Sequence, residues 1–203
     1  MGEATTISAK DVKELRDMTG AGMMDCKKAL QESGGDMEKA VDWLRAKGAS
    51  KAAKRAEKSA NEGTIGSYVH FDGKTAVIVE LNCETDFVAN TDDFRTLARD
   101  LAMHVASAAP LAVSPDEIDP SVVEREREVY RQQVLEEGKP EHIAEKIVDG
   151  KIQKFFRESA LLAQPFVKDP DKTVEQLVTE VSGRTGEKIE VARFARFKVG
   201  ERS

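Results

Sequence analysis

Asn82-Cys83-Glu84-Thr85-Asp86-Phe87-Val88-Ala89-Asn90 joins an alternating apolar run to a helical one. The stretch sets a carboxylate beside an aromatic ring at a predicted strand-to-helix turn. A large aromatic side chain at such a turn either packs into the local core or enters a partner protein. Both interpretations of Phe87 stay open from the local sequence alone.

The residues on both sides of this turn predict a small antiparallel sheet and a long helix. Two alternating runs flank the hairpin turn Asp72-Gly73 and predict a pair of strands, with apolar positions at Ile65, Val69, Phe71, Val77, Val79, Leu81 and Cys83. Thr91 or Asp92 can cap the helix, whose apolar period is Phe94, Leu97, Ala98, Leu101, Val105 and Ala108. Residues 188–199 predict a third strand, with an irregular alternation near Phe194.

Residues 8–48 predict three short helices. Ser8 and Asp11 fit a capping box at the start of the first helix. The glycines of Thr19-Gly20-Ala21-Gly22 predict a tight turn before the second helix. The apolar stripes of these two helices are Val12, Leu15 and Met18, then Met23, Cys26 and Leu30. We expect the third helix to end at Gly48.

Two further segments complete the predicted architecture. Residues 49–61 are rich in alanine and lysine and predict a solvated helical linker. Residues from about 121 to 163 predict two helices with narrow apolar seams, which indicate a protruding antiparallel helical hairpin, or coiled coil. The fold class is therefore α+β. A three-helix module in residues 1–48 and the linker precede a core in residues 62–203, which has a three-stranded antiparallel sheet and the hairpin inserted before the last strand.

The composition is that of a soluble globular protein. Of the 203 residues, 40% are hydrophobic and 33% are charged, and the net charge is −6. An acidic balance argues against sequence-independent nucleic-acid binding, which depends on a basic surface. No apolar run approaches the ~18 residues that a membrane span needs. The first residues show no secretory signal and there are only two cysteines, so we expect a reducing, cytoplasmic location.

Residues with the chemistry of a catalytic or metal site are scattered. The three histidines, His70, His104 and His142, have no metal-type spacing, and no glycine-rich phosphate loop is present. Cys83 and His70 can form a nucleophilic pair on neighbouring strands. However, Cys83 shares the phase of the buried strand positions, whereas His70 has the opposite phase. We therefore expect no catalytic residues, no metal site and no cofactor.

Two long segments resemble a known family. Leu15-Arg16 followed by Thr19-Gly20-Ala21-Gly22-Met23-Met24-Asp25-Cys26-Lys27-Lys28-Ala29-Leu30 closely resembles the N-terminal signature of bacterial elongation factor Ts. Residues 82–90 resemble the family's second signature. Gly138-Lys139-Pro140, residues 143–150 and Gln164-Pro165-Phe166-Val167 resemble its coiled-coil insertion and exit. The likeness covers essentially the whole chain, in the short form with a single core subdomain.

The resemblance implies a guanine nucleotide exchange factor that promotes GDP release from elongation factor Tu during translation. It implies that the first module is similar to a ubiquitin-associated domain and docks on the partner through Arg16, Met23 and Met24. Packing of Met23 in the module's own core is the alternative. The segment Thr85, Asp86, Phe87 and Val88 is implied to press on the partner near its magnesium ion and displace that ion. His70 matches a second contact in the core.

The chain departs from longer members of this family, which resemble two core halves in tandem. Here Gly66-Ser67-Tyr68-Val69-His70 and Thr85-Asp86-Phe87 belong to one hairpin unit. Short members are thought to work as homodimers, and we expect the same, because one sheet edge and one face would otherwise stay uncovered. No nucleic acid and no membrane is an expected partner.

Three other interpretations are compatible with parts of the chain. The first is a peptide-binding helper that uses only residues 8–48. The second is a ribosome- or RNA-associated protein that uses the cations between Lys51 and Lys58, although no aromatic residue is interleaved there for base stacking. The third is an enzyme with Cys83 as its nucleophile. Each accounts for fewer of the residues than the exchange factor does.

Overall fold

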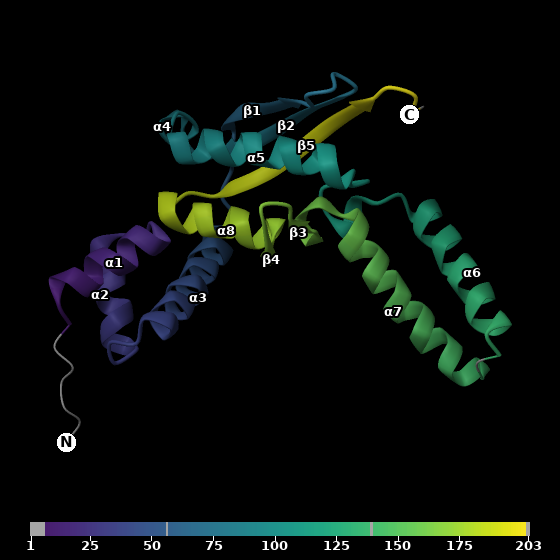
Figure 1. The fold of residues 1–203 in the computed structure, drawn as a ribbon, viewed down its shortest axis with the longest axis horizontal. Coiled ribbons are helices and arrows are strands. Elements are labelled where there is room, and N and C mark those ends of the chain that lie inside the picture. The colour runs from purple at the N-terminus through teal and green to yellow at the C-terminus, as the bar shows by residue number, and fades with distance from the viewer. Residues whose placement is uncertain (1–6, 56, 139, 202–203) are drawn as a thin grey trace. The chain divides into compact units, whose positions relative to one another are not determined.

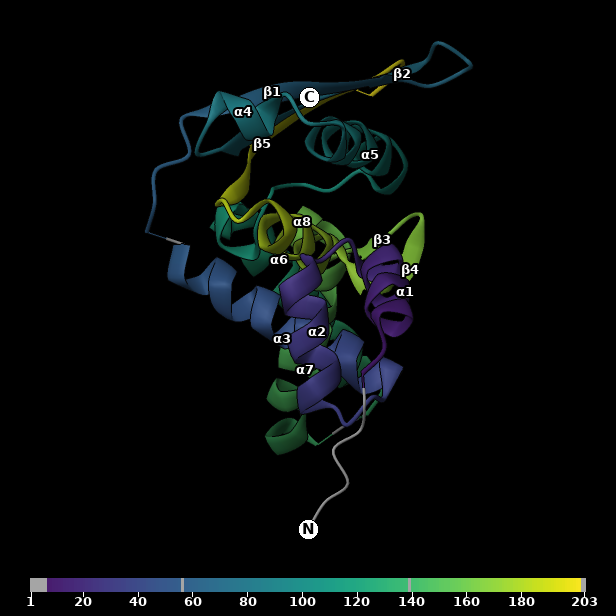
Figure 2. The same ribbon diagram turned by 90° about the vertical axis from the view of Figure 1, so that its left-hand side faces the viewer.

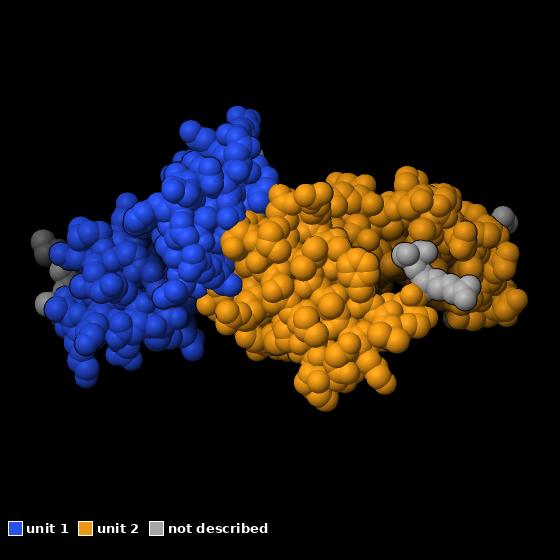
Figure 3. Space-filling view, turned by 90° about the horizontal axis from the view of Figure 1, so that it is seen from above, with its two compact units in different colours: residues 1–63, 82–95, 178–190 blue, residues 64–81, 96–177, 191–203 orange. Residues whose placement is uncertain are grey.

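The computed structural model describes residues 7–55, 57–138 and 140–201. They form two compact units, which Figure 3 colours separately. The first unit comprises residues 1–63, 82–95 and 178–190, and the second comprises residues 64–81, 96–177 and 191–203. These units are built from segments distant in sequence, whereas the boundaries 1–48, 49–61 and 62–203 are consecutive and stay a prediction.

The first unit contains three packed helices, α1 (Ala9–Thr19), α2 (Met23–Glu32) and α3 (Met37–Arg55) (Figure 2). The predicted capping box is confirmed, because the Ser8 hydroxyl accepts the Asp11 N–H at 3.1 Å and the Asp11 carboxylate accepts the Ser8 N–H at 3.2 Å. The helices share a small apolar core made of Val12, Leu15, Cys26, Ala29, Leu30 and Ala40.

Two details of this region differ from the prediction. Met18 is 63% exposed and does not belong to the core, because Val12 and Leu15 alone fill the inner face of α1. Helix α3 does not end at Gly48 but continues to Arg55. A helix tolerates an interior glycine at a cost of about 1 kcal/mol. Packing in this region restricts Gly183 of the later chain and not Gly48: a Cβ on Gly183 would lie only 3.2 Å from the Gly48 Cα, whereas a Cβ on Gly48 would meet no described neighbour within 4 Å.

The predicted sheet has the order β1 (Glu62–Val69), β2 (Thr75–Cys83) and β5 (Ile189–Lys198). Its central strand is antiparallel to both neighbours: the His70 N–H donates to the Thr75 carbonyl, and the Val199 N–H donates to the Lys74 carbonyl, both at 2.9 Å. Gly73 has a φ of 68° in the hairpin turn, as the Asp-Gly pair predicted.

Helix α5 (Asp92–Ala108) covers one face of this sheet (Figure 2). The buried residues of β2 are Thr75, Val77, Val79, Leu81 and Cys83, and those of α5 include Leu97, Ala98, Leu101, Ala102 and Val105. The helix comes so close to β1 that a Cβ on Gly66 would lie 2.2 Å from the Ala98 carbonyl oxygen. Gly66 is therefore a packing requirement of the sheet and its helix.

The opposite face of the sheet carries exposed apolar side chains, namely Ile65, Val69, Ile78, Phe197 and Val199. We call this set the open sheet face. Arg193 of β5 reaches Glu80 of β2 across it at 2.7 Å. In β5 the inward positions change from Ile189 and Val191 to the half-buried Phe194 and Arg196. This change of phase lies where the sequence predicted an irregular alternation.

In the second unit, α6 (Pro120–Glu136) and α7 (Glu141–Ser159) lie side by side (Figure 1). Their shared apolar cluster is Val134, Ala144, Val148 and Ile152. Ion pairs also join them, including Arg127 with Asp149 at 2.7 Å. The chain enters and leaves this segment at paired positions, because the Leu111 N–H donates to the Ser159 carbonyl at 2.8 Å and the Leu161 N–H donates to the Ala112 carbonyl at 2.9 Å.

A two-stranded antiparallel ribbon of β3 (Pro165–Phe166) and β4 (Asp169–Thr173) precedes α8 (Val174–Thr185). The sequence pattern did not predict this ribbon, because β3 is too short to show alternation. Buried His104 of α5 fixes it. The His104 Nδ1 accepts the Val167 N–H at 3.2 Å, so Nε2 carries the proton and donates to Gln164 Oε1 at 2.9 Å. Burial lowers the pKa of His104, and the hydrogen bond to Gln164 opposes this effect.

Candidate partner-binding surfaces

The stretch between β2 and α5 folds into a single helical turn, α4 (Asp86–Ala89). Val88 faces the interior and is 5% exposed, whereas Phe87 projects outward and is 80% exposed. Asp86 is also exposed. The interpretation of Phe87 as a cap on the local core does not fit this arrangement. A ring and a carboxylate instead stand together on the surface.

Hydrogen bonds hold the turn from both ends. The Thr85 hydroxyl accepts the Val88 N–H at 3.4 Å and so caps α4. The Asn90 side chain donates to the Asp86 carbonyl at 2.8 Å, and the Thr91 hydroxyl donates to the Val88 carbonyl at 2.8 Å. The signature, residues 82–90, therefore carries Thr85 and Asn90, two of the groups that close its turn, and Thr91 follows it directly.

A residue outside the signature holds the start of the turn. The Glu187 carboxylate accepts the Glu84 N–H at 3.1 Å and the Thr85 N–H at 3.0 Å through one oxygen, and the Thr85 hydroxyl at 2.7 Å through the other. In return, the Glu84 carboxylate accepts the Lys188 N–H at 2.7 Å and an Arg55 N–H at 2.8 Å. These two contacts, the Lys188 N–H first, lower the pKa of Glu84.

A second exposed surface surrounds the turn between α1 and α2. Met23 is 46% exposed and Met24 is 75% exposed, so neither is a core residue, and Arg16 is exposed beside them in sequence. Met18 adds an exposed apolar side chain that the helical period had assigned to the core. Flexible methionine side chains at a surface suit an adaptable protein contact.

The predicted site residues fall in both units. Arg16, Met23, Met24 and residues 85–88 belong to the first unit, and His70 belongs to the second. The half-buried His70 lies after β1, where its Nδ1 is 3.0 Å from the Tyr68 hydroxyl and its ring centroid is 4.4 Å from that of Phe71. The sequence did not predict a role for Glu187 or Arg55, because no local pattern links these residues to the signature.

The described residues hold no group of three or more histidine, cysteine, aspartate or glutamate side chains placed to bind a metal ion. Cys83 is buried, its thiol donates to the Thr85 carbonyl at 3.1 Å, and burial raises its pKa. These features are typical of a structural cysteine. Among the helices of residues 7–55, 57–138 and 140–201, none has the length and apolar character needed to cross a membrane.

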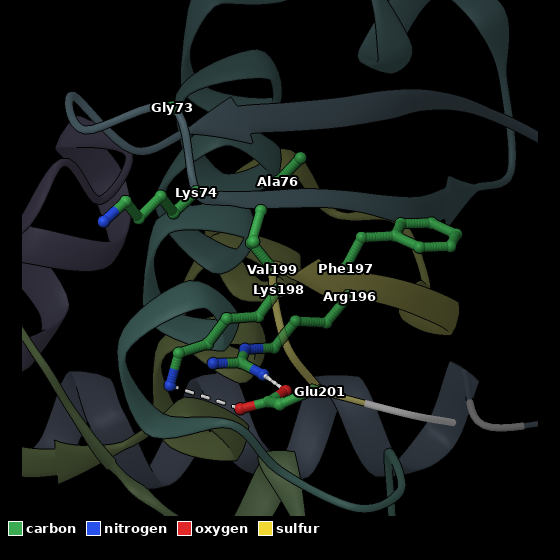
Figure 4. Close-up of a pocket in the computed structure, with 8 residues that line it drawn as sticks. All are labelled: Gly73, Lys74, Ala76, Arg196, Phe197, Lys198, Val199 and Glu201. Atoms are coloured by element: carbon green, nitrogen blue, oxygen red, sulfur yellow. Dashed lines mark hydrogen bonds and ion pairs between the residues drawn. The ribbon is translucent and has the colours of Figure 1, made fainter.

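A groove of about 430 Å³ lies between the β1–β2 turn and the end of β5 (Figure 4). Phe197 and Val199 line it together with the cations Lys74, Arg196 and Lys198. Glu201 pairs with both Arg196 and Lys198, so a carboxylate of the chain itself already neutralises part of the positive charge. Because Glu201 already pairs with two of these cations, the positive charge of the groove does not by itself indicate an anionic ligand.

The fold and the exposed turn are typical of an α+β protein that acts through contact surfaces. A family model described as "Elongation factor TS" matches residues 5–201. The chain is 56% identical over 195 residues to "Elongation factor Ts" of Desulforamulus reducens, which covers 96% of this chain and 90% of the relative. It is 55% identical over 194 residues to that of Nitratidesulfovibrio vulgaris, with 96% and 97% covered, and 54% identical over 195 residues to that of Thermosipho melanesiensis, with 96% and 100% covered. The chain belongs to the elongation factor Ts family.

Proposed function

We propose that this protein is a guanine nucleotide exchange factor that promotes GDP release from elongation factor Tu during translation elongation in the cytoplasm. Membership of the elongation factor Ts family supports the class of activity. The observation that carries the proposal is Phe87, an exposed ring on a turn whose backbone is fixed by hydrogen bonds. No bond chemistry by this chain is required.

The mechanism is a thermodynamic linkage. A factor that binds the nucleotide-free partner more tightly than the GDP-bound partner weakens GDP binding by the same ratio. We propose that Thr85, Asp86, Phe87 and Val88 press on the partner close to its magnesium site. Displacement of the magnesium ion removes the largest charge that compensates the phosphates of GDP. Asp86 contributes a hydrogen-bond acceptor or a local negative charge.

We propose two further contacts. Helices α1–α3 form a module similar to a ubiquitin-associated domain, which docks on the partner through Arg16, Met23 and Met24. The exposure of both methionines supports this contact. His70, on the sheet hairpin, provides a second contact from the core. The helices α6 and α7 form the antiparallel coiled-coil insertion of the family, and their separate apolar cluster supports this assignment.

We also propose that the protein is a homodimer through the open sheet face. Ile65, Val69, Ile78 and Phe197 form an apolar surface on three adjacent strands, and Val199 extends it just beyond the end of β5, as expected of a face that pairs with a copy of itself. The edge strands β1 and β5 flank this face. A two-fold pairing of such faces would bury the apolar side chains without any further domain.

A GDP-release assay tests the function directly. Release of a fluorescent GDP analogue from the cognate GTPase is followed by stopped flow with and without the full chain, at one magnesium concentration. Faster release with the protein supports the proposal, and unchanged release overturns it. Two controls address the rival interpretations. A truncation after residue 61 should abolish the acceleration of GDP release, whereas it would leave the full activity of a peptide-binding helper intact. Binding of RNA by this protein that weakens steeply with salt would support the RNA-associated interpretation.

A further inference from the structure

We propose that Glu187 is a positioning residue for the turn that carries Phe87. Its carboxylate crosses 102 positions of sequence to accept the Thr85 N–H and the Thr85 hydroxyl, and it also accepts the Glu84 N–H. Both residues belong to the first compact unit. The inference rests on the proposed exchange function, because positioning has a purpose only if the turn acts on a partner.

The geometry gives the Thr85 hydroxyl one orientation. Its proton points to Glu187 Oε1 at 2.7 Å, which leaves an oxygen lone pair for the Val88 N–H at 3.4 Å. The cap of α4 is therefore oriented by the carboxylate. A four-residue turn has little helical stability of its own, so the direction in which Phe87 projects depends on this cap.

The contact is reciprocal, which distinguishes it from a single surface ion pair. Glu187 accepts the Glu84 N–H, while the Glu84 carboxylate accepts the Lys188 N–H at 2.7 Å. Arg55 of α3 also donates to the Glu84 carboxylate, so a third segment of the chain takes part in this set of hydrogen bonds. Hydrogen bonds from backbone N–H groups to a carboxylate are charge-assisted and have fixed geometry. The turn is thus held to the segment before β5 and to α3 before any partner arrives.

Positioning of this kind predicts a specific kinetic effect. We expect Glu187→Ala to lower the maximal GDP-release rate at saturating factor by about tenfold, because the turn then spends only part of its time in the productive conformation. The factor concentration at half-maximal rate should change by less than about twofold, since the docking surfaces are intact. Glu187→Gln keeps the shape and one acceptor oxygen, but its NH2 group cannot accept the Thr85 hydroxyl, so it should restore the rate only in part.

Two controls separate positioning from general stability. Glu190→Ala removes a nearby carboxylate whose ion-pair partner is the Lys188 ammonium, at 2.6 Å, and not a group of the turn, so it should leave the rate unchanged. In a double-mutant cycle, Glu187→Ala should add little to Phe87→Ala, because both act through the same ring. If Glu187→Ala slowed GDP release by the same factor in the parent protein and in the Phe87→Ala variant, the proposal would be overturned.

Amide hydrogen exchange of the full chain gives a readout that needs no GTPase. Glu187→Ala should speed exchange at the Glu84 and Thr85 amides by at least about tenfold relative to the Gly20 amide, because both donate to Glu187. Unchanged exchange would overturn the positioning role even if the parent protein accelerates GDP release. If the parent does not accelerate release, the proposed function fails, and amide exchange alone then upholds or overturns the role of Glu187.

Discussion

Phe87 and Val88 are neighbours in one four-residue turn, yet Phe87 is 80% exposed and Val88 is 5% exposed. The buried neighbour anchors the turn, so the exposed ring can be removed without loss of core packing. This relationship makes the role of Phe87 testable by a single substitution.

Phe87→Ala should keep the fold and slow GDP release from elongation factor Tu by more than about tenfold, the effect of losing a hot spot of about 2 kcal/mol. Stopped-flow release of a fluorescent GDP analogue measures the rate, and thermal unfolding measures the stability. Leu111→Ala, at another exposed apolar residue, is the matched control and should have no effect on release. Equal rates for Phe87→Ala and the parent would contradict the role of the ring.

Met24→Ala should weaken binding to the partner by about fivefold to thirtyfold, in the range of about 1–2 kcal/mol for an interface anchor. The unfolding free energy should stay the same, because Met24 is 75% exposed. Leu30→Ala in the same module is the opposite case: Leu30 is fully buried, and its loss should cost about 2–5 kcal/mol of stability. Calorimetric titration and urea unfolding measure the two quantities. A drop in stability for Met24→Ala with unchanged binding would refute the docking role.

Ile78→Lys should convert a dimer into a monomer. Ile78 lies on the central strand of the open sheet face, where a lysine is tolerated in water but not in a buried apolar interface. Size-exclusion chromatography with light scattering at micromolar concentration gives the mass. Leu111→Lys places the same charge outside the sheet and should leave the mass unchanged. A parent protein that is already monomeric under these conditions rules out the dimer.

His104 should make stability depend on pH. Burial lowers the pKa of the folded ring, whereas the unfolded chain binds a proton near the ordinary value of 6.5. The contribution of neutral His104 to the free energy of unfolding is therefore complete above the unfolded pKa. It is lost as the pH falls from that value toward the lower pKa of the folded ring. Urea unfolding between pH 7.5 and 5 measures the trend. His104→Gln has no titrating group and should show a flatter profile, and parallel profiles would exclude His104 as the cause.

Local patterns predicted most of the elements, since their causes lie within a few residues. The Ser8 capping box, the Asp72-Gly73 hairpin and the apolar period of α5 each follow from contacts between near neighbours. Met18 and Gly48 were misjudged for the opposite reason. Helical spacing does not tell how much of a face the neighbouring helices cover, nor that α3 continues past Gly48 where Gly183 of α8 approaches it.

The candidate site was only partly predictable. The local sequence placed the ring and the carboxylate at a strand-to-helix turn but left open whether Phe87 is buried, and only the resemblance to a known signature implied a contact with a partner. The support from Glu187 and Arg55 was not, since these residues join the signature only through the tertiary fold. Hydrogen bonds between distant segments leave no periodic trace in one sequence.

The paired main-chain hydrogen bonds at Leu111–Ser159 and Ala112–Leu161 hold together the two ends of the segment that contains α6 and α7. A change in the helices themselves therefore leaves the distance between the two ends of the segment unchanged. Evolution can therefore lengthen, shorten or re-decorate both helices in matched steps without disturbing the rest of the protein, because the two ends of the segment stay joined by these main-chain bonds. A protein engineer has the same freedom to attach a label or a new binding segment at its far end.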